Sequence, residues 1–597
     1  MRFLIIILTF TFLYCSSIYS QIDTSKVVIT TNLSKNFLDK TGRPLTGKGV
    51  VIGDIDSGID IFHPLFFFAD GGKFNWFDID KNGVFTPGVD GVDLNNNGII
   101  DEDEILNYLE MKNGLKPFIL TDTKVFNPDM DFLYVDINKN GKRDYGELAG
   151  FTESDPTYGE PLFIAIDKNH NNILDTDEEI VALKTSKIRA VREKDGTIRR
   201  RGIDLIKTEV DTIGHGTGVC GLIVGGTLGV QKIHGIAPDA ELVLANIKYD
   251  YTPRFVRQFP DMIRFLQAEK VDIILFEDGE WMYEFMDGSS EEELLTNELA
   301  REGIIVVGGA GNLASGKMHI TDTLKSGKTY SYSFTCPNLV KDKTNDYVFI
   351  SFLWKNPSNF ISFTVETPEG QQSKAVNKGA NYFKLGNYLI YYSREISPRN
   401  TVMMKFQISK QDLNSIGGKW SITVTSMEDD IIHGFLTDVS QSWSDASEWV
   451  SNKISDLNTV TFPSTADSCI SVGAYIVNYP IPNFETEIGN LCYYSGRGNK
   501  LNGDIGVDIC APGHLTFTAG KYYQYQFFSG TSSAAPHVVG LAALMKQYNT
   551  SLTHSMFRNI LRSTSLRDRF TGDVPNIEWG YGKLAPENAL EYLIQMK

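Results

Sequence analysis

Hydrophobic residues along this chain fall into short unbroken runs, with helix-like patterns between them. The run GVVIGDID at residues 49–56 is apolar, rich in β-branched residues and begins with glycine. Such a run is typical of a strand that is buried on both faces. Strands that alternate with helices form a parallel, doubly wound sheet, so the predicted fold class is α/β. Similar runs occupy 241–247, 271–276 and 304–307, and helical patterns occupy 261–269 and 291–301.

Two stretches interrupt this alternation of strands and helices. The first, residues 71–202, is rich in Asp, Asn and Gly and repeats a short motif. The second, residues 317–438, consists of strand-like runs separated by turn residues, with few helix signals. This second pattern predicts an all-β sandwich or jelly roll. Its runs are YSYSF, YVFISFLW, FISFTVET, YLIYYS, VMMKFQIS and KWSITVTS.

The chain is long enough for several hydrophobic cores. Its 597 residues are 42% hydrophobic and carry a net charge of −18. An acidic balance argues against nucleic acid as a partner, because binding phosphates needs a basic surface. We expect one α/β unit split by two insertions, and the oligomeric state stays open. The expected segments are 1–20 (signal peptide), 21–70, 203–316 and 439–597 (α/β unit), 71–202 (Asp/Asn-rich insertion) and 317–438 (β-sandwich insertion).

The N-terminus has the pattern of a secretory signal. After a positive flank, residues 3–14 are apolar, uncharged and too few to span a bilayer. Small residues follow this run, and the expected cleavage point lies between Ser20 and Gln21. Cys15 raises a lipoprotein alternative, which the bulky Tyr14 before it disfavours. Because no later segment reads as transmembrane, we expect an exported, soluble protein, secreted or periplasmic.

Three short motifs, spread over most of the chain, carry the residue types of an activated serine. Asp56 closes the first apolar run in DSG, His215 stands in HGT, and Ser532 stands in GTSSAAP. A serine hydroxyl is a poor nucleophile near neutral pH. It needs a neutral imidazole to accept its proton and a carboxylate to orient that imidazole. Each motif alone is weak, but together they predict peptide-bond hydrolysis.

A fourth motif supplies a donor for the oxyanion of a tetrahedral intermediate. The run 304–307 leads into GGAGN, which places the amide of Asn312 just after a buried strand. This amide can donate a hydrogen bond to the oxyanion, together with the backbone N–H of Ser532. We therefore assign catalytic roles to Asp56, His215, Ser532 and Asn312.

These motifs resemble those of the subtilisin-like serine peptidases, or subtilases, in which the triad runs Asp, His, Ser along the chain. Further matches are GIAP at 235–238, SGRG at 495–498, DICAPG at 508–513 and WGYGK at 579–583. The resemblance covers half of the chain and implies a serine-type endopeptidase acting on polypeptides. It also implies that Asp56 orients the imidazole, that His215 acts as base and then acid, and that Ser532 is the nucleophile.

The substrate-binding strand departs from the family pattern. Where subtilases usually read SLGG, this chain reads EDGE at 277–280. Gly279 keeps a close approach to the substrate backbone possible. The acids favour basic or amine-bearing side chains if they face the cleft rather than solvent, and both orientations are open. The residues assigned to substrate binding are Glu277, Asp278, Gly279, Gly309 and Gly311.

The Asp/Asn-rich insertion contains three segments that match a twelve-residue calcium loop. Calcium takes six to eight oxygen ligands; side chains at positions 1, 3 and 5 converge, glycine at 6 allows the turn, and glutamate at 12 binds with both oxygens. A weaker fourth match starts at Asp78 but lacks the final glutamate. Strand-like sequence leads into the loops, so we expect structural Ca²⁺ in a β-containing insertion. The expected ligands are Asp93, Asn95, Asn97, Asp101, Glu104; Asp136, Asn138, Asn140, Asp144, Glu147; and Asp167, Asn169, Asn171, Asp175, Glu178.

Two alternatives to a general endopeptidase stay open. One is a non-catalytic binding protein that keeps the fold. It is motivated by the altered EDGE segment and by the short stretch 21–45, which is too small for an independently folding prodomain. The other is a narrow processing protease for one partner, since the two insertions could restrict access to the cleft. Activity on unfolded casein, compared with a single native target, separates narrow from general proteolysis.

Overall fold

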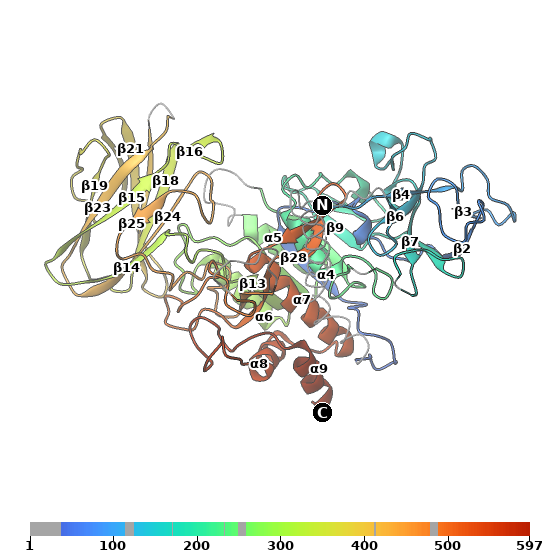
Figure 1. The fold of residues 1–597 in the computed structure, drawn as a ribbon. Helices are drawn as coiled ribbons and strands as arrows, with labels where there is room; N and C mark the ends of the chain where they lie inside the picture. Colours follow the sequence, from blue (N-terminus) through green and yellow to red (C-terminus); the bar gives the residue numbers. More distant parts are fainter. Residues whose placement is uncertain are drawn as a thin grey trace, which may run out of the picture.

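The computed structural model describes residues 37–113, 125–169, 171–231, 233–248, 258–410, 414–477 and 487–596. The signal peptide expected at 1–20, with Cys15, lies outside these residues. A central α/β unit separates two β-rich units, which lie on opposite sides of it (Figure 1). One is formed by residues 73–182, here called the loop unit, and the other by residues 319–450, here called the sandwich.

An eight-stranded sheet forms the centre of the α/β unit. Its order is β10-β9-β11-β1-β12-β13-β26-β27, and every neighbouring pair except β10–β9 is parallel. β1 (Val51–Asp56) lies inside the sheet and is buried at every position, as its unbroken apolar run predicts. The other strands are β9 (Ile188–Arg192), β10 (Ile198–Arg200), β11 (Glu241–Asn246), β12 (Ile273–Phe276), β13 (Ile305–Gly309), β26 (Ile470–Ile476) and β27 (Ile509–His514).

Helices cover both faces of this sheet, which confirms the predicted α/β class. α4 (His215–Val224) and α7 (Thr531–Tyr548) share a core with Ile52 of β1. α5 (Phe259–Ala268) and α6 (Glu291–Arg301) pack against the other face, where Ile55 lies. Because side chains alternate along a strand, Asp54 and Asp56 share the α4 face with Ile52. Two further helices, α8 (His554–Thr564) and α9 (Pro586–Gln595), follow α7.

The main sheet takes two strands from the segment that the sequence analysis places in the first insertion. β9 pairs in parallel with β11, and β10 pairs with β9. Their sequences, IRAVR and IRR, mix apolar and basic residues because this edge of the sheet is only partly buried. They therefore lack the unbroken apolar run by which the other strands were predicted, and the insertion ends before Ile188.

The loop unit has a six-stranded antiparallel sheet and a core of its own. The order is β3-β2-β8-β7-β6-β4, and Trp76, Leu133 and Phe163 are among its buried residues. Each predicted calcium loop follows the end of a strand. The strand-like sequences that lead into the loops, such as FLYVD and FIAID, predict this arrangement. The strands are β2 (Lys73–Phe77), β3 (Gly91–Val92), β4 (Leu106–Leu109), β6 (Phe132–Val135), β7 (Leu162–Ile166) and β8 (Glu179–Ala182).

The sandwich consists of two antiparallel sheets around one hydrophobic core, in which Trp354, Trp420 and Trp449 are buried. Each of the six predicted runs forms a strand. β25 (Glu448–Val450) pairs with β15, so this unit extends beyond residue 438. The sheets are β14-β24-β18-β22-β21-β20 and β19-β23-β15-β25, with β14 (His319–Leu324), β15 (Thr329–Cys336), β18 (Tyr347–Trp354), β19 (Ile361–Glu366), β20 (Ala380–Leu385), β21 (Tyr388–Ile396), β22 (Val402–Lys410), β23 (Gly418–Ser426) and β24 (Asp430–Asp438).

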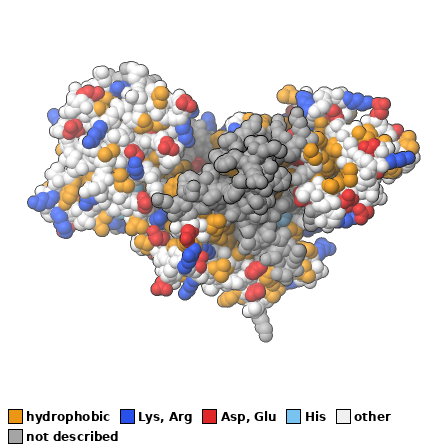
Figure 2. Space-filling model, viewed as in Figure 1, with side chains coloured by type: hydrophobic (Ala, Val, Ile, Leu, Met, Phe, Trp, Pro, Cys, Tyr) orange, Lys and Arg blue, Asp and Glu red, His pale blue; other side chains and the backbone are white. Residues whose placement is uncertain are grey.

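The surface agrees with the acidic but mixed composition of the chain. On the face shown in Figure 2, acidic and basic side chains are interspersed over the sandwich and over the loop unit. Within the described residues, no helix is both long and apolar enough to cross a bilayer. The cysteines described, from Cys220 to Cys510, are all buried thiols without a disulfide.

Candidate active site and calcium loops

The carboxyl ends of neighbouring strands bring the predicted catalytic residues to one edge of the main sheet. Asp56 ends β1, Glu277 follows β12, and Asn312 comes shortly after β13. In open α/β sheets this edge is where ligands bind. A cavity of about 600 Å³ lies here, and His215, Ser532, Glu277 and Asn312 all line it.

Asp56 and His215 form a close pair in this cavity. Asp56 is 1% exposed, and each of its carboxylate oxygens lies 2.8 Å from Nδ1 of His215. The N–H of Ser57 donates a further hydrogen bond to Oδ1 of Asp56. His215 is the first residue of α4, and its side chain remains 32% exposed. The carboxylate favours the tautomer protonated on Nδ1, which leaves Nε2 as a proton acceptor.

The charges around the imidazole oppose the effect of its burial. Burial lowers the pKa of His215, but the carboxylates of Asp56, Glu277 and Asp278 outweigh this and raise it to about 10. Asp54 lies on the same strand face as Asp56, and burial together with the Asp56 charge raises the pKa of Asp54 well above its usual range. The number of ionised carboxylates near His215 therefore controls the pH at which it can act as a base.

Ser532 lies in the first turn of α7, a helix of 18 residues. The N-terminus of a helix stabilises negative charge, which favours a developing oxyanion there. Gly530 precedes the helix with φ of +130°, and a Cβ on it would lie 3.3 Å from Nδ2 of Asn312. The backbone conformation thus favours glycine here, and a Cβ would also press on the side chain of Asn312. Pro536 lies one turn further along α7 and cannot donate to the carbonyl of Ser532.

The side chain of Asn312 is oriented by the residue that precedes the serine. The backbone N–H of Thr531 donates to Oδ1 of Asn312 at 2.9 Å, and the Thr531 hydroxyl lies 3.3 Å from the same oxygen. The Thr531 hydroxyl also accepts from the N–H of Gly311 at 3.1 Å. Because Oδ1 is occupied by donors, the amide nitrogen of Asn312 is the end that can donate to a group bound beside Ser532.

The acids of the EDGE segment take different orientations. Glu280 is 5% exposed, and its Oε1 accepts from the N–H groups of Trp281 at 2.9 Å and Met282 at 2.7 Å. Burial raises the pKa of Glu280 to about 8. Glu277 is 6% exposed, and both of its carboxylate oxygens are buried without a hydrogen-bond partner within the described part of the chain. Neither of these two glutamates points to solvent, and Asp278 lines the cavity.

The sandwich forms part of the cleft, and the structure identifies the residues that take part. Trp443 packs against Trp281 with ring centroids 4.5 Å apart and the ring planes tilted by 43°. A Cβ on Gly279 would lie 3.0 Å from the Trp443 ring and 2.7 Å from the hydroxyl of Thr461, so the wall closes on that glycine. Gly309 and Gly311 line the cavity as predicted for substrate binding. Lining residues from the sandwich are Val340, Lys341, Lys343, Thr437, Val439, Ser440, Gln441, Ser442 and Trp443.

Two predicted calcium loops have the same internal bonding. In the loop 93–104, Asp93 accepts from the N–H groups of positions 5 and 6, at 3.1 and 2.8 Å. The side-chain amides of positions 3 and 5 lie 3.0 and 2.9 Å from Oδ2 of Asp101, so positions 3, 5 and 9 converge. Glu104 is 3% exposed and accepts from positions 2, 3 and 9. The loop 167–178 repeats these contacts.

In the loop that starts at Asp136, the closing carboxylate is Glu160 and not the predicted Glu147. Oε1 of Glu160 accepts from position 2 and Oε2 from Asp144 at position 9, both at 2.8 Å. These are the contacts that position 12 makes in the other loops. Glu160 is 1% exposed, whereas Glu147 is half exposed and lies 3.5 Å from Lys207. The chain makes an excursion between Asp144 and Glu160, so the expected spacing does not hold.

The weak fourth match is closed by Asp90, which lies just beyond the twelve-residue pattern. Oδ1 and Oδ2 of Asp90 accept from Ile79 at position 2 and Thr86 at position 9, each at 2.7 Å. Asp78 accepts from the N–H of Gly83 at 2.9 Å, as the first residue does in the other loops. Asp90 is one position later than the expected glutamate, and its side chain is one methylene shorter.

The fold and the site together define an α/β protein with an Asp–His pair and a helix-borne serine at the carboxyl edge of a parallel sheet. The chain belongs to the subtilase family: the family model described as "Subtilase family" matches residues 47–382 and 439–582. The resemblance noted in the motifs is thereby confirmed.

Individual relatives match shorter parts of the chain. "Tripeptidyl-peptidase 2" of Drosophila melanogaster is 33% identical over 138 residues, which cover 21% of this chain and 9% of that protein. "Serine protease AprX" of Bacillus subtilis is 29% identical over 149 residues, which cover 23% of this chain and 32% of that protein. The chain thus matches less than two thirds of the length of these relatives. The structure of the Clostridium perfringens CspB protease covers 96% of this chain and 100% of its own, with a TM-score of 0.64 and 17% identity, and shows the fold alone.

Proposed function

We propose that this protein is a secreted serine endopeptidase that hydrolyses peptide bonds in polypeptide substrates and is stabilised by calcium. The observation that carries this proposal is the contact of both Asp56 carboxylate oxygens with Nδ1 of His215, in a cavity that Ser532 also lines. Secretion rests on the signal-like sequence at the N-terminus. Family membership supports the reaction class.

The proposed reaction follows from these positions. The hydroxyl oxygen of Ser532 attacks the scissile carbonyl carbon while Nε2 of His215 takes its proton, and Asp56 stabilises the imidazolium. The carbonyl oxygen becomes an oxyanion, which accepts from the amide of Asn312 and from the N–H of Ser532. His215 then gives the proton to the leaving amine. Water hydrolyses the acyl-enzyme through the same base.

Reaction with a fluorophosphonate tests the proposal directly, because only an activated serine is phosphonylated. We expect wild-type protein in calcium to be labelled and Ser532→Ala not to be labelled. Asn312→Ala should react about 10²–10³-fold more slowly, because the phosphonyl oxygen occupies the oxyanion position. Gel fluorescence against time measures both effects. If the folded wild-type protein takes no label, the non-catalytic alternative replaces this proposal.

A narrow processing protease is the second candidate, favoured by the sandwich residues in the cleft. Trp443 and Lys341 belong to the sandwich and line the same cavity as Ser532. A wall of this kind limits which polypeptides can reach the serine. Cleavage of unfolded casein at a rate comparable to that of short peptides would favour the general endopeptidase instead.

Calcium is proposed as a structural ion of the loop unit. The fit rests on the side chains present: the amides at positions 3 and 5 contact the carboxylate at position 9, and a buried carboxylate closes each loop. Hard oxygen ligands in this order are those that calcium prefers. When bound, calcium would neutralise the converging carboxylates and thereby hold the loops in place.

Glu160→Gln and Glu147→Gln form a matched pair for the calcium proposal. We expect calcium to raise the melting temperature of the wild type, and Glu160→Gln to reduce this rise by a loss of about 1–3 kcal/mol of stabilisation. Glu147→Gln should keep the full rise, because Glu147 makes none of the closing contacts. Differential scanning calorimetry in calcium and in chelator measures the increment separately from any calcium-independent destabilisation. Equal increments in the two variants would contradict the assignment of Glu160.

A further inference from the structure

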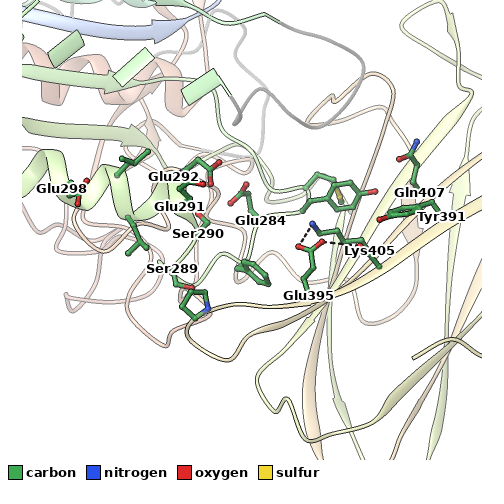
Figure 3. A pocket seen from close by; sticks show the side chains of 17 residues that line it. Glu284, Ser289, Ser290, Glu291, Glu292, Glu298, Tyr391, Glu395, Lys405 and Gln407 are labelled. Atoms are coloured by element: carbon green, nitrogen blue, oxygen red, sulfur yellow. Dashed lines mark hydrogen bonds and ion pairs between the residues drawn. The ribbon is translucent and has the colours of Figure 1, made fainter. Parts of the chain in front are cut away.

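A second cavity, of about 1110 Å³, lies between the start of α6 and the sandwich strands β21 and β22 (Figure 3). Its lining is strongly acidic. The first-turn position of Glu291 and Glu292 has a structural reason, since acids there stabilise a helix N-terminus. Glu284 lies before the helix and has no such reason. The acidic residues of the lining are Glu284, Glu291, Glu292, Glu298 and Glu395, and the basic residue is Lys405.

Glu284 is a buried acid, and one of its carboxyl oxygens lacks a hydrogen-bond partner within the described part of the chain. It is 7% exposed, and its Oε2 has no hydrogen-bond partner among the residues that the structure describes. Burial raises the pKa of Glu284 well above its usual range, and the carboxylates of Glu293, Glu292 and Glu280 raise it further. In Figure 3 its side chain lies between the first turn of α6 and the Lys405 side chain. A buried carboxyl without a nearby positive charge keeps its proton, and a cation that binds beside it stabilises the ionised form.

One of the side chains that line the cavity, Lys405, is itself a cation. Its contacts indicate which other cations the cavity can bind. Nζ of Lys405 lies 2.8 Å from Oε2 of Glu395 and 5.2 Å from the ring centroid of Tyr283. A carboxylate and an aromatic face together stabilise an ammonium or guanidinium group. Phe285 and Tyr391 add aromatic surface to the same lining.

A metal ion fits this cavity less well than an organic cation. A small ion needs several ligand atoms close together. Among the described residues, three His, Cys, Asp or Glu ligand atoms lie within 4.8 Å of one another at Asp78, Asp80 and Asp90, in the loop unit. The glutamates of the cavity are therefore too widely spaced to surround one small ion. An extended cation can contact several of them at once.

We propose that this cavity binds an alkylammonium or guanidinium group, with Glu284 as its counter-charge. The group could belong to a lysine or arginine of a bound polypeptide or to a free polyamine, which share this chemistry. None of the residues that line this cavity lines the cavity of Ser532, so the site is separate from the proposed catalytic centre and does not depend on its activity.

Titration calorimetry with spermidine and with the capped peptide acetyl-Gly-Arg-Gly-amide tests this proposal. All proteins carry Glu277→Gln, so that the catalytic cleft contributes no acidic site at that position. We expect Glu284→Gln to weaken binding at least about tenfold, as for loss of a charged hydrogen bond. Lys405→Gln should tighten binding, because it releases Glu395. Glu302→Gln, which removes the same charge at the exposed end of α6, should have no effect.

Proton release gives a second readout that a structural role of Glu284 would not move. A cation that binds beside Glu284 favours its ionised form, so binding to protein with Glu284 intact should release a proton and give a heat that depends on the buffer. Glu284→Gln should lose this dependence. If Glu284→Gln does not fold, Tyr391→Ala is the second variant, and weaker binding is expected from the loss of its aromatic face.

The two probes distinguish the two possible sources of the cation, and the Glu284 variant tests whether the site exists. Binding of spermidine alone identifies a free polyamine, and binding of the peptide identifies a polypeptide side chain. The proposal is overturned if neither probe binds at millimolar concentration, or if both bind equally well with and without Glu284. Because only binding is measured, a failure of the proposed peptidase reaction leaves these outcomes unchanged.

Discussion

His215→Ala is expected to lower kcat for peptide hydrolysis by about 10⁶-fold, with a much smaller change in KM. Without the imidazole, no group beside Ser532 can take its proton as the tetrahedral intermediate forms. Asp56 cannot replace it, because its carboxylate is buried at the end of β1 and is held by the N–H of Ser57, a contact that His215→Ala leaves in place. The measurement is steady-state hydrolysis of a fluorogenic peptide by folded protein in calcium.

Asp56→Asn is a milder substitution that tests the contact between Asp56 and His215. The substitution keeps the shape of the side chain but presents a neutral amide to Nδ1 of His215. The loss should be about 10⁴-fold, because the imidazole can adopt the wrong tautomer and its cation is no longer stabilised. A His215→Ala protein that keeps more than a hundredth of wild-type kcat would rule out His215 as the general base.

The α/β unit could be predicted because the residues that define each of its strands and motifs are adjacent in the sequence. The first residues of β1 are apolar or glycine because both faces of this strand are buried, and Asp56 marks its end. The same holds for GGAGN after β13, where glycine and Asn312 follow a buried strand. Each motif includes the small residues that its own backbone needs, such as Gly530 at φ of +130°. Short segments were therefore enough to identify the family.

What the sequence did not reveal depends on contacts between distant segments. Glu160 closes a loop by bonding to Ile137, 23 residues earlier, because the chain between them leaves the loop and returns. A fixed twelve-residue spacing cannot anticipate such an excursion and selects Glu147 instead. Trp443 reaches Gly279 from the sandwich, and its surrounding sequence carries no motif that points to a substrate cleft.

Glu277 combines a feature seen in the sequence with one seen only in the structure. The sequence shows that this position departs from the family pattern, and the structure shows that the side chain is buried. Both of its carboxylate oxygens lack a hydrogen-bond partner within the described residues, beside the cavity of Ser532. Burial raises the pKa of Glu277 well above its usual range, while the charge of His215 and the nearby hydroxyl of Ser532 oppose this. A basic substrate side chain would supply the missing partner. We therefore propose that Glu277 selects substrates with lysine or arginine near the scissile bond.

Glu277→Gln is expected to reduce the preference for basic over apolar side chains by about 10²-fold in kcat/KM, since it removes one partner of a desolvated charge pair. It should also move the acidic limb of the kcat/KM profile to lower pH. The imidazolium of His215 and an ionised Glu277 stabilise each other, so removing the carboxylate lowers the pKa of His215. The base then becomes neutral, and active, at a lower pH.

Glu280→Gln is the matched control for both effects. Glu280 is as deeply buried as Glu277, but its carboxylate is already held by the N–H groups of Trp281 and Met282. It is also not among the charges that raise the pKa of His215. Its substitution should leave the pH limb and the selectivity unchanged even if it lowers stability. If the two variants behave alike, burial of an acid in this segment, and not the charge of Glu277, governs the cleft.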